Sequence, residues 1–173
     1  MILKLLGGAM IMVACSLYGF AASNRYSLRP KDIRKLRAAV QMLETEVIFG
    51  CTPLPIAMSN VAFKVDGGIR SFFRKVSEEL QSGENYSLNT AWSGAVDKLI
   101  GETCLTKADR ELLMDFGKVL GCSDREDQKK HFELFYIQFK HYEDIAEDER
   151  KKNEKLYKSL GFLSGVVIFI MLI

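Results

Sequence analysis

Both ends of the chain are hydrophobic, and each hydrophobic segment is bordered by basic residues on the side facing the middle of the sequence. Leu5–Ala22 and Leu160–Ile173 contain no charged side chain. The bordering basic residues are Arg25, Arg29, Lys31, Arg34, Lys35 and Arg37 at one end and Arg150, Lys151, Lys152, Lys155 and Lys158 at the other. Lys and Arg resist translocation, so basic flanks mark the cytoplasmic side of a membrane helix. The sequence therefore predicts a cytoplasmic domain anchored at both ends, with both termini on the non-cytoplasmic side of the cell membrane.

The predicted organisation is an N-terminal membrane anchor over 1–24, a helical domain over 25–158 and a C-terminal membrane segment over 159–173. A helix of about 20 apolar residues spans the roughly 30 Å hydrocarbon core. The C-terminal segment is shorter and can span it only if neighbouring residues extend the helix or the bilayer thins locally. Gly161 and Gly165 form a GxxxG pattern, which permits close packing of two membrane helices. The alternative is that these glycines reflect only the general abundance of glycine in such helices.

Two other interpretations of the N-terminus are weaker. A cleaved signal peptide is disfavoured because Phe20 precedes Ala21 and Ala22 and spoils the small-residue cleavage pattern. Val13, Ala14 and Cys15 loosely resemble a lipoprotein cleavage box, but cleavage there would export the basic segment that follows, against the charge rule. A retained membrane anchor is the favoured interpretation.

The middle of the chain is almost neutral, which argues against a nucleic-acid partner. The whole chain has 24 basic and 22 acidic residues, whereas a nucleic-acid surface needs a concentrated basic patch. The four cysteines form no CxxC pair and no metal-binding spacing, and reduced thiols are expected on the cytoplasmic side. About 135 residues between the anchors are enough for one compact domain.

Apolar residues in this middle segment recur at spacings of three and four, which is typical of helices with one buried face. The first stripe runs from Ile33 to Val47, and Pro30 suits the first turn of its helix because the missing N–H is not needed there. Further stripes predict helices from Leu54 to Val65, from Ile69 to Leu80, from Leu88 to Leu99 and from Thr106 to Leu120.

The sequence also predicts where several helices begin and end. Ser87 is a predicted N-cap, Thr106 with Asp109 resembles a capping box, and Gly121 is a predicted C-terminal stop. Ser123 with Glu126 makes a second capping box, after which no proline or glycine occurs before Gly161.

The sixth helix is the longest. Its predicted buried stripe is Phe132, Phe135, Phe139, Tyr142 and Ile145, with the acidic residues Glu143, Asp144, Glu147, Asp148 and Glu149 facing water. Nothing interrupts it before the membrane segment, so we expect one helix continuous with the C-terminal anchor, with a bend near Gly161 as an alternative. The fold class is all-α: a six-helix cytoplasmic bundle between two transmembrane helices.

No catalytic, metal-binding or cofactor-binding residue is predicted, and the chain is not expected to be an enzyme. His131 and His141 lie about 80° apart around a helix and share no ligand face. A phosphate-binding loop of the GxxxxGK[ST] type is absent. The acidic cluster Asp124–Asp127 complements the dipole of a first helical turn, an interpretation we favour over acid–base catalysis. The aromatic residues Phe72, Phe73, Phe132, Phe135 and Phe139 are predicted to be core.

The basic run after the first anchor has three interpretations. Arg25, Arg29, Arg34, Lys35 and Arg37 are predicted to set topology and contact anionic headgroups, at about 1 kcal/mol per residue near the membrane surface. They alternatively form a docking surface for an acidic partner. Nucleic acid is the third and least supported partner.

Four segments carry a resemblance to a known family. The segments Arg29–Glu46, Phe49–Pro55, Leu120–Phe132 and Lys152–Leu163 resemble the stage III sporulation protein AB family of endospore-forming Firmicutes. The resemblance extends over the whole chain, including its length and its paired anchors, although Cys51 stands where a more polar residue is expected.

That resemblance implies a fold like the cytoplasmic domain of the type II secretion F platform protein. It places the chain in the mother-cell membrane around the forespore, within a secretion-like channel built by an eight-protein operon. The implied partners are the other proteins of that operon and a secretion ATPase-like protein, stage III sporulation protein AA; self-association is left open. We hypothesise that the bundle receives the ATPase and that the long last helix carries its displacement rigidly into the membrane.

Two further functions remain as alternatives. A platform protein of a pilus or another secretion machine is disfavoured because such proteins usually carry two bundles and more membrane helices. An exported, lipid-anchored helical binding protein would require fatty-acid attachment at Cys15.

Overall fold

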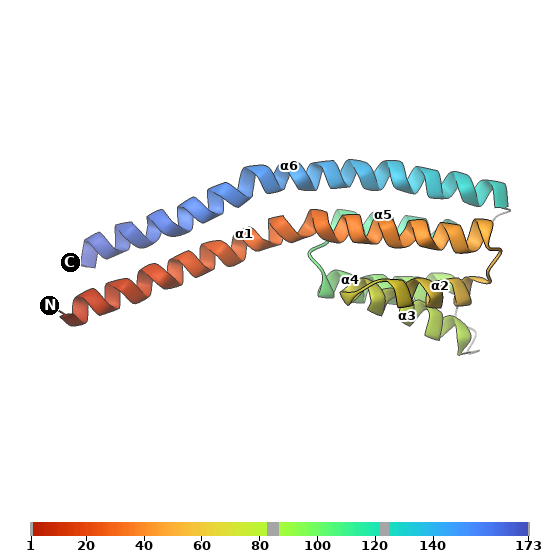
Figure 1. Cartoon of the computed structure of the whole chain (residues 1–173), viewed down its shortest axis with the longest axis horizontal. Coiled ribbons are helices and arrows are strands. Elements are labelled where there is room, and N and C mark those ends of the chain that lie inside the picture. The colour runs from red at the N-terminus through yellow and green to blue at the C-terminus, as the bar shows by residue number, and fades with distance from the viewer. Residues whose placement is uncertain (1, 83–86, 122–124, 173) are drawn as a thin grey trace. The chain divides into compact units, whose positions relative to one another are not determined.

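The computed structural model describes residues 2–82, 87–121 and 125–172, and these residues form helices and connecting turns without a strand. Six α-helices and one π-helical segment follow each other along the described residues. Figure 1 labels the α-helices. Their bounds are α1 Ile2–Glu44, η1 Thr45–Phe49, α2 Leu54–Lys64, α3 Gly67–Gln81, α4 Leu88–Glu102, α5 Lys107–Val119 and α6 Arg125–Leu172. The all-α prediction with six helices is confirmed over the described residues.

The helices divide between two compact units, which are described separately below. One unit contains residues 1–30 and 144–173, and the other contains residues 31–143. Helices α1 and α6 each contribute to both units, whereas α2, α3, α4 and α5 belong to the second. Within the second unit, α2 packs against α3, α3 against α4, and α4 against α5.

Within the residues it describes, the structure contains no helix that is long and apolar enough to cross a membrane. Most side chains of Leu5–Ala22 and Leu160–Ile173, including those of the predicted packing residues Gly161 and Gly165, lie outside the described set. The two membrane anchors therefore stay predictions.

Pro30 does not occupy the first turn of a helix, and that prediction was wrong. It lies inside α1, which begins at Ile2. A proline inside a helix removes one hydrogen bond and opposes the carbonyl four residues earlier, at a cost of about 3 kcal/mol. Residues 20–29 contain no glycine or second proline, so one isolated breaker does not end the helix here.

Three predicted helix boundaries are confirmed. The Ser87 side chain accepts a hydrogen bond from the Thr90 N–H at the start of α4. Thr106 and Asp109 form the reciprocal capping box at the start of α5. Gly121 follows that helix with a φ of +78°, in the left-handed region that glycine adopts most easily. The predicted cap at Ser123 lies outside the described residues.

The end of η1 has an unusual backbone. Gly50 is needed for close approach, because a Cβ at this position would lie 2.7 Å from the Glu46 carbonyl oxygen. The left-handed position falls on the next residue, Cys51, with a φ of +49°. A side chain in this region crowds its own carbonyl, which costs about 1–2 kcal/mol.

Replacing Cys51 with glycine is therefore expected to raise the free energy of unfolding by about 0.5–1 kcal/mol. The gain is smaller than the relieved strain because glycine also loses more backbone entropy on folding. Cys51→Ala is the matched control, since alanine keeps the Cβ and should give no such gain. Urea unfolding followed by circular dichroism measures both variants, and equal stability of the two would contradict the strain argument.

Glu46 joins η1 to α2. Its carboxylate accepts hydrogen bonds from Thr52 Oγ1 at 3.1 Å, Asn60 Nδ2 at 3.0 Å and Lys64 Nζ at 3.1 Å. The hydrogen bond from Asn60 and then that from Lys64 hold the pKa of this carboxyl below its ordinary value of 4.5.

A lowered pKa in the folded state makes stability depend on pH in a definite direction. The contribution of Glu46 is fully present above its unfolded pKa and is lost as the pH falls through the lower, folded pKa. We expect Glu46→Gln to make the unfolding free energy less sensitive to pH below about 4.5. Urea unfolding across this range measures the effect, and Glu133→Gln is the control because Glu133 is exposed within α6. Parallel curves for all three proteins would contradict the prediction.

Candidate functional site

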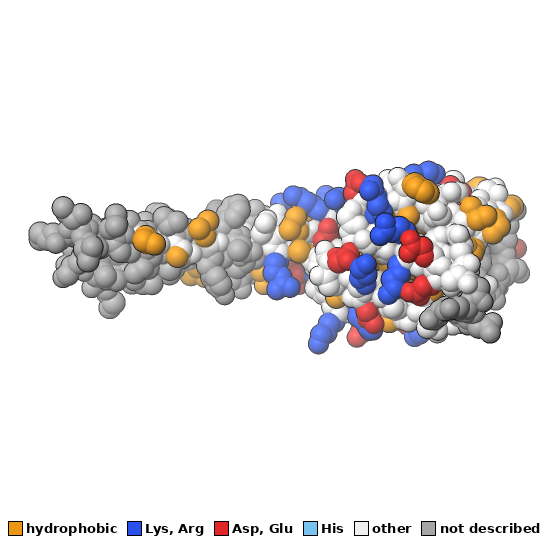
Figure 2. Space-filling view, turned by 90° about the horizontal axis from the view of Figure 1, so that it is seen from below, with side chains coloured by type: hydrophobic (Ala, Val, Ile, Leu, Met, Phe, Trp, Pro, Cys, Tyr) orange, Lys and Arg blue, Asp and Glu red, His pale blue; other side chains and the backbone are white. Residues whose placement is uncertain are grey.

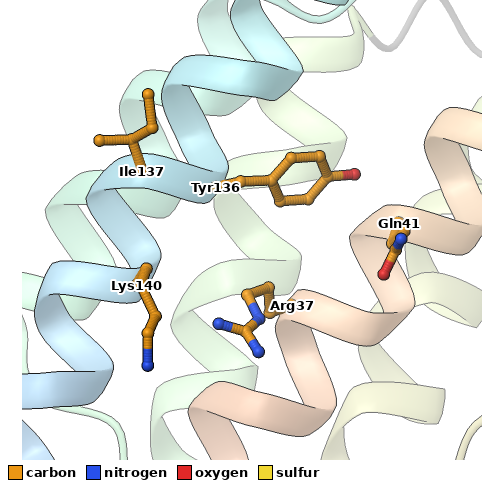
Figure 3. A pocket seen from close by; sticks show the side chains of 5 residues that line it. All are labelled: Arg37, Gln41, Tyr136, Ile137 and Lys140. Atoms are coloured by element: carbon orange, nitrogen blue, oxygen red, sulfur yellow. The ribbon is translucent and has the colours of Figure 1, made fainter.

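A groove of about 490 Å³ lies between α1 and α6 in the unit formed by residues 31–143 (Figure 3). Arg37 and Gln41 line it from α1, and Tyr136, Ile137 and Lys140 line it from α6. The side chains of Arg37 and Tyr136 extend toward the opposite helix in the close view. The two charged residues of this lining are both cations.

A buried carboxylate lies beside these cations. Arg37 Nη1 is 2.7 Å from Oε2 of Glu143, and Arg34 Nε and Lys140 Nζ are each 3.8 Å from its Oε1. The Glu143 side chain is only 10% exposed, whereas those of Arg34 and Lys140 are 50% and 54% exposed. A carboxylate is buried at tolerable cost only when it is paired, and here three cations surround it.

The buried position of Glu143 corrects the predicted face of α6. Glu143 was expected to face water and Ile145 to be buried, but Glu143 is buried and Ile145 is 39% exposed. The observed buried stripe runs Phe132, Phe135, Phe139, Glu143 and Ala146. Both stripes keep helical spacing, and the arginines of α1 decide between them because they supply the opposite charges that let a carboxylate be buried.

Tyr136 marks the other end of the groove. Its hydroxyl donates a hydrogen bond of 2.8 Å to Oε2 of Glu44 in α1. Burial, followed by the hydrogen bond and the negative charge of Glu44, raises the pKa of this phenol above its ordinary value of 10. Tyr136 is therefore a neutral hydrogen-bond donor at physiological pH, and it fixes the spacing of the two helices that form the groove.

The structure separates the five basic residues that the sequence grouped together. Arg34 and Arg37 meet at Glu143, while Lys35 and Arg25 are exposed elsewhere on α1. Arg29 is 8% exposed, and its Nη1 lies 2.6 Å from Oε2 of Glu149 within the unit formed by residues 1–30 and 144–173. The predicted contact with lipid or with an acidic partner is not tested by this arrangement.

Several groove residues were missed by the sequence reasoning. Gln41, Tyr136, Ile137 and Lys140 belong to no motif, and only the packing of α6 on α1 brings them together. One signal was present in the sequence. Glu143 comes four residues after Phe139 and three before Ala146, so it falls on the same helix face as the apolar stripe. A carboxylate in step with a buried stripe indicates a buried ion pair with another helix.

The groove has the chemistry of a binding surface. No group of three or more His, Cys, Asp or Glu residues able to hold a metal occurs among the described residues. Within the predicted acidic cluster, Asp127 Oδ1 lies 3.0 Å from Lys130 Nζ, and Asp124 lies outside the described residues. Cys51 and Cys104 form no disulfide. The predicted core residues Phe72, Phe73, Phe132, Phe135 and Phe139 are all buried.

Over the described residues, fold and site together define an all-helical protein with a cation-lined groove between its first and last helices. The profile of the family described as stage III sporulation protein AB matches residues 4–173. The chain belongs to the stage III sporulation protein AB family, and this membership supports a role in sporulation. Neither the family description nor the name of the relative below is that of an enzyme.

Two known proteins are similar over most of the chain. Stage III sporulation protein AB of Bacillus subtilis (strain 168) is 39% identical over 170 residues, which cover 98% of this chain and 99% of that protein. A solved structure of stage III sporulation protein AB matches with a TM-score of 0.67 and 35% identity, covering 72% of this chain and 98% of that one.

Proposed function

We propose that this protein is a non-enzymatic platform component of a secretion-like channel between mother cell and forespore, and that it docks a cytoplasmic secretion ATPase. The observation that carries the proposal is the groove between α1 and α6, lined by Arg37, Gln41, Tyr136, Ile137 and Lys140. Its exposed cations and its apolar side chain can bind a protein segment. Family membership supplies the sporulation context.

The proposed location is the mother-cell membrane around the forespore, with the bundle in the cytoplasm and both termini on the other side. The uncharged segments Leu5–Ala22 and Leu160–Ile173 and their basic flanks support this topology. The partners in this proposal are the membrane, the secretion ATPase-like stage III sporulation protein AA and the other proteins of the same operon.

The mechanism we propose is mechanical transmission along α6. This helix is continuous from Arg125 to Leu172, so a displacement at its bundle end is carried along one element. Asp144 and Ile145 are exposed residues within it, so changing them removes little packing.

A double glycine at these positions tests transmission. Asp144→Gly with Ile145→Gly should lower heat-resistant spore counts while membrane insertion and ATPase binding persist, because each glycine weakens a helix by about 1 kcal/mol relative to alanine. The matched control is the double alanine variant at the same positions, which keeps the helix stiff. If the double glycine strain sporulated as well as the double alanine strain, rigid transmission would be wrong.

ATPase docking has its own test. The purified full-length chain in detergent micelles should retain purified stage III sporulation protein AA in a pull-down, and should do so less well at high salt because the groove is cationic. A chain that retains none of the ATPase under these conditions would exclude the docking step, while leaving the sporulation role to the genetic test.

A further inference from the structure

The groove between α1 and α6 differs from the surface formed by the other helices of its unit. On the face seen from the side of α2, α3 and α4, basic and acidic side chains are mixed (Figure 2). Helices α3, α4 and α5 carry surface ion pairs of Arg74 with Glu78, Lys98 with Glu102 and Arg110 with Asp97. In the groove, by contrast, the charged lining residues that the structure describes are Arg37 and Lys140, and the Glu44 carboxylate lies at the end marked by Tyr136.

The position of the acid explains why the groove is positive toward solvent. Glu143 pairs with both cations, and its side chain is 10% exposed, against 35% for Arg37 and 54% for Lys140. Its negative charge thus lies beneath the cations. Arg37 lies 2.7 Å from Glu143, whereas Lys140 lies 3.8 Å from it and is largely exposed. An incoming carboxylate can therefore recruit Lys140 at a cost of only about 0–1 kcal/mol while Arg37 still pairs with the buried Glu143.

The groove also has an apolar side. Ile137 is 66% exposed, and Leu134, three residues earlier on the same face of α6, is 55% exposed. Exposed aliphatic side chains beside cations favour an amphipathic protein segment over a small anion, since a small anion would use the charges alone. A shallow trough between two helices accepts a third helix by side-chain interdigitation.

We propose that this groove binds an acidic amphipathic helix of a protein partner, with a carboxylate of that helix at Lys140 and an apolar side chain against Ile137. The inference deepens the proposed function and rests on it, because it names the surface on which the platform receives its partner. Tyr136 acts as a positioning residue, since its hydrogen bond to Glu44 holds α6 at its distance from α1.

Two substitutions test the two halves of the surface. Lys140→Glu reverses a charge of the groove, and Ile137→Glu removes its apolar contact. Lys118→Glu is the matched control for the first, because Lys118 is also an exposed lysine with an acidic partner three residues away, but on α5. Phe63→Glu is the control for the second, because Phe63 is an 83% exposed apolar residue on α2.

The readouts are binding of purified stage III sporulation protein AA to the full-length chain in detergent, and heat-resistant spores at equal protein level. We expect both groove variants to weaken binding and lower spore counts about tenfold or more, as charge reversal and lost anchors do at interface centres. The two control variants should match the wild type. A wild-type complex that dissociates with rising salt would support the carboxylate contact.

The possible results separate this inference from the proposed function. Normal spores and normal binding in both groove variants would contradict the groove as a binding site, even if a deletion strain failed to sporulate. If the wild-type chain does not bind this ATPase, the ATPase assignment fails. If both groove variants then lose spores while the control variants sporulate normally, the groove is supported as the binding site of another acidic partner. A groove variant that changes only self-association, measured by cross-linking, would contradict the proposal, because the groove would then bind a second copy of the chain.

Discussion

Replacing Trp92 with alanine is expected to lower the free energy of unfolding by about 3–5 kcal/mol, the range for deleting a large buried aromatic side chain. Trp92 in α4 is fully buried. Its ring centroid lies 4.8 Å from that of Phe72 in α3 and 5.8 Å from that of Phe116 in α5. Its Nε1 donates a hydrogen bond of 2.8 Å to the Leu113 carbonyl, so one side chain joins three helices.

Two variants make this prediction specific. Phe63→Ala removes an aromatic side chain that is 83% exposed, and we expect a change within about 0.5 kcal/mol. Trp92→Phe keeps a buried ring but loses the donor to Leu113, with an expected loss between these values. Urea unfolding followed by far-ultraviolet circular dichroism compares the three. A Trp92→Ala variant as stable as Phe63→Ala would show that the aromatic contacts are not the centre of the core.

Replacing Gly117 with alanine is expected to destabilise the protein by about 2–3 kcal/mol, at the upper end of the usual cost of overpacking. Gly117 is buried in α5 against the face of Trp92. An added Cβ would lie 2.3 Å from Trp92 Cδ1 and 2.6 Å from Nε1. The ring is held by Phe72, Phe116 and the Leu113 carbonyl, so the helices must separate to admit one methyl group.

Gly101 provides the opposite control. It lies in α4, and an added Cβ there would meet no atom within 4 Å. Gly101→Ala should therefore stabilise the protein by about 0.5–1 kcal/mol through helix propensity alone. The chain has one tryptophan, so the fluorescence of Trp92 also reports the disturbance at Gly117 directly. A Gly117→Ala variant whose stability and emission match the wild type would refute the close packing of α5 on Trp92.

The positions of the helices were predictable because local chemistry specifies them. Helix α2 was expected from Leu54 to Val65 and is observed from Leu54 to Lys64. Pro53 precedes it, Pro55 lies in its first turn, and apolar spacing continues through it. The caps at Ser87 and Thr106 use side chains within three residues of the groups that they bind. Such contacts depend on neighbouring residues alone, and a sequence displays them directly.

The wrong predictions fall where residues distant in the sequence determine which side chains are buried. Periodicity alone allowed Tyr142 and Ile145 to continue the buried stripe, whereas Arg34 and Arg37, more than one hundred residues earlier, stabilise Glu143 there instead. The groove was not predictable for the same reason, since Gln41 and Lys140 become neighbours only when α1 and α6 pack. Pro30 was wrongly predicted to begin a helix because the helix-forming residues on both sides of it were not considered.

The measurement that tests the central claim most directly is an in-frame deletion of this gene in the organism that encodes it. Sporulation is scored by membrane-dye microscopy and by heat-resistant spore counts, with an ectopic wild-type copy as the control. A platform protein of a mother-cell-to-forespore channel predicts arrest after engulfment, with small or collapsing forespores and few heat-resistant spores, restored by the ectopic copy. Normal engulfed forespores that mature into heat-resistant spores would contradict that role.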